Sequence, residues 1–208
     1  MGVHLREIRA FLHPIWRSVL GFTQEFMSLR FDEAKATQAA ALFLRLRGGC
    51  MSYLKLIKLL YLTDRAALLR WGIPVTTDHY VSMDHGPVVS RTYDLIREDM
   101  PKPGWAEYIS PPLGEYEVRL RKEAPTDRLS RAEEQLIREV FDQYGQRSRW
   151  QLVDYVHTLP EWKNPHGSSI PLPIREILKA GGEDEDEIRA VLRELNGIAA
   201  AEETLSIP

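Results

Sequence analysis

Apolar side chains recur every three or four residues along the first thirty positions, which predicts an amphipathic helical segment. Pro14 interrupts this pattern, and because proline lacks the amide hydrogen of a helix interior, we expect a kink or a break near His13. The segment carries more large aromatic side chains than one narrow stripe needs, namely Phe11, Trp16, Phe22 and Phe26. Aromatic residues dominate protein recognition surfaces. The segment is therefore either a helix of its own core or an arm that binds a partner.

Two further helices are predicted between residues 32 and 72. Asp32 is suited to cap a helix that the Gly48-Gly49 pair ends. Ser52 is expected to cap a strongly apolar helix from about Tyr53 to Trp71, and Gly72 ends it. Apolar residues cover most of the circumference of this helix, so we expect it to be the central and most buried one.

Short β elements are expected in the middle of the chain. The segment from His79 to Met83 alternates in polarity and predicts a strand. Pro87 suits the first turn of a helix, which we expect to continue to about Glu98. The runs from Trp105 to Ile109 and from Tyr116 to Leu120 alternate on either side of a proline- and glycine-containing turn, which predicts a β-hairpin.

Helices return in the C-terminal part. Ser130 with Glu133, and Ser148 with Gln151, form two capping boxes, and each is expected to open a helix. A last helix should begin near Asp184, where acidic residues favour the positive end of the helix dipole. The fold class predicted is mainly α (α+β): a compact helical domain around a central buried helix, with a short strand and a β-hairpin.

Composition narrows the classes of function. Cys50 is the lone cysteine of 208 residues, so an internal disulfide framework is excluded and a reducing cytoplasm is expected. No apolar stretch reaches the roughly 18 residues of a membrane-spanning helix, and the N-terminus lacks the pattern of a secretory signal. The net charge of −3 disfavours nucleic acid as a partner unless one face is locally basic.

Residues that could carry out catalysis form only loose groups. Asp64, Asp84 and His85, with the Asp78-His79 pair, could bind a metal or act as an acid–base set. Such residues beside turns more often cap backbone amides. No motif with a known catalytic mechanism is present, so we expect no enzyme activity and no cofactor.

The central helix also carries cations. Lys55, Lys58 and Arg65 form a narrow strip that could contact phosphates. The alternative is a solvated helix edge, or an internal ion pair between Arg65 and one of the aspartates. If the strip contacts the phosphates of a nucleic acid, three aromatic residues could stack on the bases, namely Trp150, Tyr155 and Trp162.

The order of these motifs resembles one known family. The segment Lys55 to Tyr61 reads K-L-I-K-L-L-Y, Asp64-Arg65 follows it, and Asp84-His85-Gly86-Pro87-Val88 comes about twenty-five residues later. This arrangement resembles the Panacea domain, also called the SocA-like antitoxin domain. The resemblance is clearest from about Asp32 to Glu98 and fainter to about Leu178.

The resemblance implies a bacterial or prophage antitoxin that neutralises a cognate protein toxin, encoded by a neighbouring gene, through direct contact. It implies no catalytic residue. The family motif residues are interpreted as mainly structural: Lys55, Lys58, Tyr61, Asp64, Arg65, Asp84, His85, Gly86 and Pro87. The predicted organisation is an N-terminal helical extension (1–31), a Panacea-like domain (32–180), and a C-terminal helix and tail (181–208).

Several alternatives stay open at this point. A DNA-binding autorepressor would need a basic face, and a proteolytic adaptor would contact the toxin in the same way as a plain inhibitor. A metal-dependent hydrolase around Asp64, Asp84 and His85 is the weakest alternative. A homodimer is compatible with the sequence.

Overall fold

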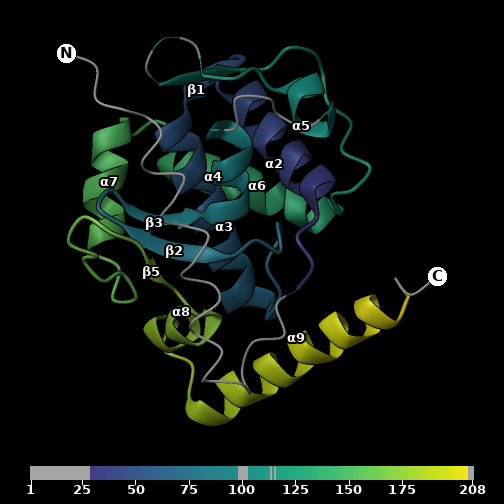
Figure 1. The fold of residues 1–208 in the computed structure, drawn as a ribbon, viewed down its shortest axis with the longest axis vertical. Coiled ribbons are helices and arrows are strands. Elements are labelled where there is room, and N and C mark those ends of the chain that lie inside the picture. The colour runs from purple at the N-terminus through teal and green to yellow at the C-terminus, as the bar shows by residue number, and fades with distance from the viewer. Residues whose placement is uncertain (1–28, 98–102, 113, 115, 206–208) are drawn as a thin grey trace.

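The chain is described by a computed structural model that covers residues 29–97, 103–112, 114 and 116–205 (Figure 1). The helices are α2 (Glu33–Leu46), α3 (Tyr53–Trp71), α4 (Ser90–Arg97), α5 (Pro103–Tyr108), α6 (Arg131–Tyr144), α7 (Arg149–His157), α8 (Ile174–Gly181) and α9 (Glu185–Leu205). The strands are β1 (Cys50–Ser52), β2 (Tyr80–Met83), β3 (Gly86–Val89), β4 (Glu117–Arg119) and β5 (Ile170–Pro171). The mainly α (α+β) class is confirmed.

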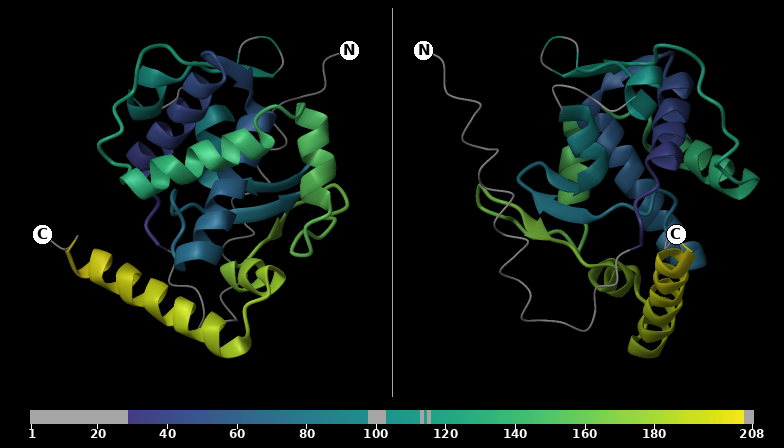
Figure 2. Two further views of the ribbon diagram at one scale, coloured as in Figure 1. Left: turned by 180° about the vertical axis from the view of Figure 1, so that it is seen from behind. Right: turned by 45° about the vertical axis from the view of Figure 1, so that its right-hand side comes forward.

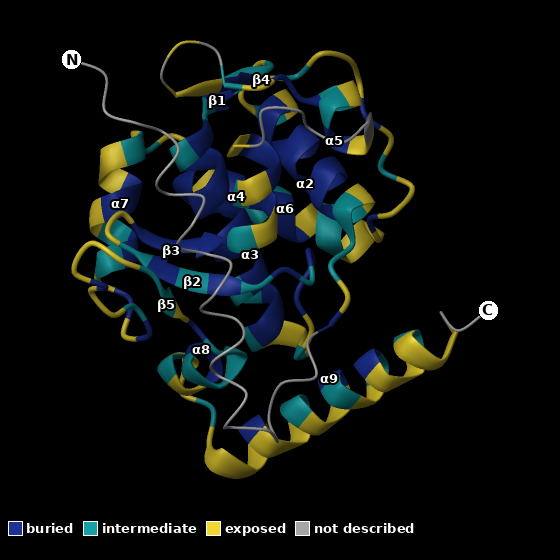
Figure 3. Cartoon of the chain, viewed as in Figure 1, coloured by how far each residue is buried: buried dark blue, intermediate teal, exposed yellow. Residues whose placement is uncertain are grey.

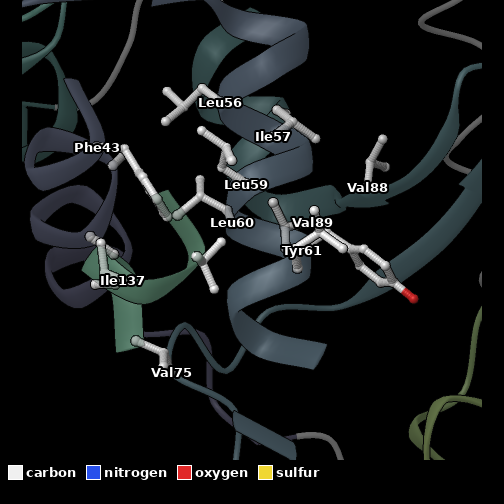
Figure 4. Close-up of a cluster of buried hydrophobic side chains, with 14 of the residues drawn as sticks. Phe43, Leu56, Ile57, Leu59, Leu60, Tyr61, Val75, Val88, Val89 and Ile137 are labelled. Carbon is white, nitrogen blue, oxygen red and sulfur yellow. The ribbon is translucent and has the colours of Figure 1, made fainter. Parts of the chain in front are cut away.

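Helix α3 is the centre of the fold, as predicted. Leu56, Leu59 and Leu60 are fully buried, and Figure 4 shows the side chains of α3 meeting Phe43 from α2 and Ile137 from α6. Helices α2, α6, α7 and α8 and strand β3 all pack against α3. A helix that is apolar around most of its circumference is stable only when neighbours cover it on several sides.

The strands form two small antiparallel sheets. In one, β2 pairs with β3, placing Tyr80 opposite Val89, and β5 pairs with the other edge of β2. In the second, β1 pairs with β4, placing Met51 opposite Val118. The sheets therefore connect segments far apart in sequence, and the first sheet lies beside α3 and α7 (Figure 1).

The predicted hairpin arm at Trp105 to Ile109 was wrong, because this segment contains α5. Trp105 and Ile109 are both buried and four residues apart, a spacing that places them on one side of a helical turn. An isolated bridge links Ile109 to Leu120, and β4 pairs with β1 instead.

The predicted helix start at Pro87 was also wrong, since Gly86–Val89 is a strand and α4 begins at Ser90. The carboxylate of Asp78 sets this start: it accepts hydrogen bonds from the amides of Arg91 and Thr92, at 2.8 and 2.9 Å. Because this capping residue lies thirteen residues before Arg91, the sequence next to Ser90 does not indicate that a helix begins there. Helix α8 was not predicted.

Several helix ends were predicted correctly. Both capping boxes form, at Ser130 and at Ser148, and Gly72 ends α3 in the left-handed conformation with φ of +73°. The predicted cap at Ser52 is wrong in one respect: Ser52 occupies the N-cap position of α3, but its side chain makes no capping bond. Strand β1 ends at Ser52, so pairing with β4 fixes the backbone there.

Helix α9 extends along one side of the molecule, next to α8 (Figure 2). Ile188, Leu195 and Ala199 are its buried residues, while most of its remaining surface is exposed (Figure 3). None of the described helices combines the length and apolar character needed to cross a membrane.

Substitution of Gly86 tests the packing of β3 against α7. Gly86 has φ of +92°, and a Cβ there would lie 2.4 Å from Cγ2 of Val156. We expect Gly86→Ala to lower the free energy of unfolding by about 3 kcal/mol or more, because backbone strain and overpacking each cost about 1–3 kcal/mol. Urea unfolding measures this loss.

The matched control is Gly48→Ala, where φ is +85° and no atom lies within 4 Å of the added Cβ. Only the backbone strain applies there, so a loss of about 1–2 kcal/mol is expected. Equal losses for the two variants would show that Gly86 is needed for its conformation alone and not for close packing.

Candidate protein-binding surface

The lysines of the central helix lie inside the protein. The Lys58 ammonium donates to the carbonyl oxygen of Pro87 at 2.7 Å, and Lys58 is fully buried. Lys55 donates to the carbonyl oxygens of Gly145 and Arg147, at 2.5 and 2.7 Å. The predicted basic strip is therefore wrong, because the apolar stems cross the core and the charged ends meet backbone carbonyls.

Burial changes the acid–base behaviour of these lysines. It lowers the pKa of Lys58 from 10.5 to about 7, because one carbonyl replaces little of the lost hydration. The pKa of Lys55 is also lowered, first by burial and then by the charge of Arg47. Lys58 thus joins α3 to the start of β3, next to Gly86.

A second internal link joins α3 to the turn after α7. Glu161 is buried, and its Oε1 accepts hydrogen bonds from the hydroxyl of Tyr61 at 2.8 Å and from Nε of Arg65 at 2.7 Å. Arg65 is therefore paired inside the protein, but with a glutamate 96 residues away and not with an aspartate as predicted.

The aspartates of the proposed acid–base set hold backbone turns. Asp64 is buried and accepts from the amides of Val75 and Thr76, from the Thr76 hydroxyl, and from the Tyr80 hydroxyl at 3.0 Å. Burial raises the pKa of Asp64 to about 6, although these hydrogen bonds oppose the shift. Asp78 caps α4 in the same manner.

Asp84 and His85 occupy the exposed turn between β2 and β3. Asp84 accepts from the amide of Gly167 at 3.0 Å, and the His85 ring meets the Trp150 ring edge to face at 5.6 Å. In the part of the chain that the structure describes, no three His, Cys, Asp or Glu side chains gather as metal ligands. Asp64, Asp84 and His85 are not brought together.

Exposed aromatic rings gather beside this turn. Trp150 is 50% exposed and Tyr116 is 41% exposed. The guanidinium of Arg149 lies between them, 4.6 Å from the ring centre of Tyr116 and 5.3 Å from that of Trp150. We call Tyr116, Arg149, Trp150 and His85 the α7 aromatic surface, because Arg149 and Trp150 begin α7 and Tyr116 and His85 lie against them.

A second stack continues this surface along α7. Arg147 lies 5.3 Å from the ring centre of Tyr144 and 4.9 Å from that of Tyr155, and the two tyrosine hydroxyls are 2.9 Å apart. Next to this stack runs a shallow open groove of about 350 Å³, lined by Arg147, Gln151, Asp154, Tyr155 and Thr158.

Arg147 and Arg149 are distinguished by having no carboxylate partner among the described residues. Within the described ranges, neither Arg147 nor Arg149 forms an ion pair, whereas Arg70 pairs with Glu139 at 2.9 Å. A guanidinium stacked on a ring uses its face, so its in-plane N–H donors remain available for a carboxylate or a phosphate.

The sequence identified only part of this surface. Trp150 and Tyr155 were singled out as aromatic residues, but Tyr116 and Arg149 were missed, because the contact between them depends on tertiary structure. One local signal existed: Leu152, Val153 and Val156 form the buried side of α7, and their spacing leaves Trp150 outside it. The aromatic residues predicted to bind a partner lie outside the described residues: Phe11, Trp16, Phe22 and Phe26.

A model of a known family matches the chain. Residues 56–163, just over half of the chain, match the family model described as antitoxin SocA-like, Panacea domain. The matched range runs from α3 through α7 to the turn that contains Glu161. The resemblance predicted from the lysine helix and the Gly86-Pro87 turn is confirmed. No curated protein and no solved structure matched the chain.

The buried ammonium of Lys58 should make stability depend on pH in a defined direction. Between pH 7 and 10.5, the unfolded chain holds a proton that the folded chain has released. The free energy of unfolding therefore rises with pH in this window, by up to about 1.4 kcal/mol per unit. Lys58→Met keeps the apolar stem and removes the proton. We expect the stability of the wild type relative to Lys58→Met to increase from pH 7 to 10.

Urea unfolding at a series of pH values measures this difference. Lys163→Met, which removes an exposed lysine, serves as the comparison. A stability difference between the wild type and Lys58→Met that stays constant across the window would contradict the prediction.

Proposed function

Because the chain belongs to the Panacea domain family of SocA-like antitoxins, we propose that it is the antitoxin of a toxin–antitoxin pair. It binds a cognate protein toxin, encoded by a neighbouring gene, and neutralises it by direct contact in the cytoplasm. It acts by binding and not as an enzyme. The family match over residues 56–163 is the observation that carries this proposal.

The positions of the motif residues are consistent with a binding scaffold. The charged groups of Lys55, Lys58 and Asp64 form hydrogen bonds with carbonyls, amides and hydroxyls inside the protein. In contrast, Trp150 is exposed and the half-buried Arg149 lies beside it, and Trp and Arg with Tyr are the residue types most enriched in protein-binding hot spots. This division supports a structural role for the motif and a recognition role for exposed side chains.

A DNA-binding autorepressor is the second candidate, since stacked arginines beside an exposed tryptophan could also meet phosphates and bases. The net charge of −3 makes it the weaker candidate. A proteolytic adaptor would use the same first contact with the toxin. In each case we take 32–180 as the Panacea-like domain, with 1–31 and 181–208 as its extensions.

Co-expression tests the antitoxin proposal. Expression of the neighbouring open reading frame alone should arrest growth, and co-expression of this chain should restore it, because a stoichiometric complex blocks the toxin. Growth curves and co-purification of the two proteins measure this. Arrest that persists at equal expression levels would refute the proposal and leave the fold unaffected.

Deletion of residues 1–28 tests the predicted N-terminal arm. If this segment contacts the toxin through Phe11, Trp16, Phe22 and Phe26, the deletion should weaken toxin binding while thermal unfolding stays cooperative. Calorimetric titration and circular dichroism measure the two properties. Unchanged affinity would discard the arm, and a collapsed fold would assign the segment to the core.

A further inference from the structure

We propose that an acidic segment of the partner protein docks on the α7 aromatic surface. A carboxylate of that segment meets Arg149 and the neighbouring Arg147, and an apolar side chain next to it covers the Trp150 ring. This inference rests on the proposed function and names the surface and the chemistry through which it works.

The first step is the position of Trp150. Leu152, Val153 and Val156 already form the inward side of α7, so the core does not need this ring. Half of the Trp150 residue surface stays exposed, and its neighbours are Arg149 and His85. A large aromatic side chain that packs laterally and keeps one side free is well suited to anchor a partner.

The second step is the charge of the two stacked arginines. Among the described residues, Arg147 and Arg149 have no carboxylate partner, and each guanidinium lies over an aromatic ring. A carboxylate accepts two parallel N–H bonds from such an edge. Arg70 also lies over a tryptophan ring, that of Trp71, but it already has a carboxylate partner in Glu139.

The third step is rigidity. The carbonyl of Tyr116 accepts from the amide of Tyr53 at 2.7 Å, and the Ser148 capping box fixes the first turn of α7. Lys55 holds the carbonyl of Arg147 from inside the core. The backbone that carries the contact residues is therefore fixed before a partner arrives, which reduces the entropy lost on binding.

The fourth step concerns the class of partner, because the charges around the surface favour a protein segment over a nucleic acid. Asp84, Glu117 and Asp154 flank the surface, and Glu117 is 3.7 Å from its own cation, Arg119. A long polyanion would meet these carboxylates as well as the chain's overall negative charge. A short acidic peptide segment can pair with Arg147 and Arg149 and avoid the flanking acids.

The experiment titrates the purified product of the neighbouring open reading frame into the full-length chain and its variants. We expect Trp150→Ala and Arg149→Ala each to weaken binding by about 30-fold or more, the size typical of a hot spot. Arg149→Glu should weaken it further than Arg149→Ala, and Arg149→Lys should fall between the wild type and Arg149→Ala, since lysine keeps the charge but not the planar edge. Added salt should weaken wild-type binding more than that of Arg149→Ala.

The chain contains a matched control in Arg70 and Trp71, which form the same kind of stacked pair but have an internal carboxylate partner. Arg70→Ala and Trp71→Ala should change the affinity by less than about threefold, as expected for residues outside an interface. Urea unfolding of every variant verifies that the folded state is intact, and the charge-retaining Arg149→Lys variant keeps the test valid if Trp150→Ala does not fold.

Each result distinguishes the proposed binding surface from the antitoxin proposal. If the wild type binds and rescues growth but the α7 variants match it, the inference is overturned and the antitoxin proposal stands. If the wild type neither binds nor rescues, both are overturned. If Arg149→Ala and Trp150→Ala lose affinity for a duplex of the upstream promoter, and not for the neighbouring protein, the surface binds nucleic acid and the inference is overturned.

Discussion

The contact between the Lys58 ammonium and the Pro87 carbonyl, in the middle of the protein, is the constraint on which the surrounding structure depends. A buried cation is costly, and here a single carbonyl at 2.7 Å compensates part of that cost. The contact requires β3 to approach α3 closely, beside a glycine whose missing Cβ leaves room for Val156. Lys58, Gly86 and Pro87 of the motif thus set the distances between α3, β3 and α7.

The same motif positions α7 at three points. Lys55 holds the carbonyl of Arg147 just before the helix, Gly86 admits Val156 near its end, and Arg65 binds Glu161 in the turn that follows. The helix is therefore fixed along its whole length by residues of α3 and β3. Its outer side is exposed to solvent, so the buried attachments of α7 and the side chains proposed to meet a partner lie on opposite sides of one short helix.

Local signals made part of this structure predictable. Helix ends such as Gly72 and the capping box at Ser130 follow from backbone chemistry within a few residues, so the sequence identifies them. The start of α4 depends on Asp78, and the ion pair of Arg65 depends on Glu161, 96 residues away. Neither leaves a periodic pattern. The buried site of Lys58 was missed for the same reason, since a lysine pattern is the same whether its charge faces water or a carbonyl.

The attachment of α7 from its inner side alone has a consequence for how such a scaffold can diversify. Trp150, Gln151 and Asp154 are exposed, and their replacement would leave the buried attachments of Arg147, Val156 and the turn after the helix in place. The stability of the fold and the chemistry of the outer side of α7 are thus separable. If that side contacts the partner as proposed, one framework can change its outer side chains for a different target without refolding.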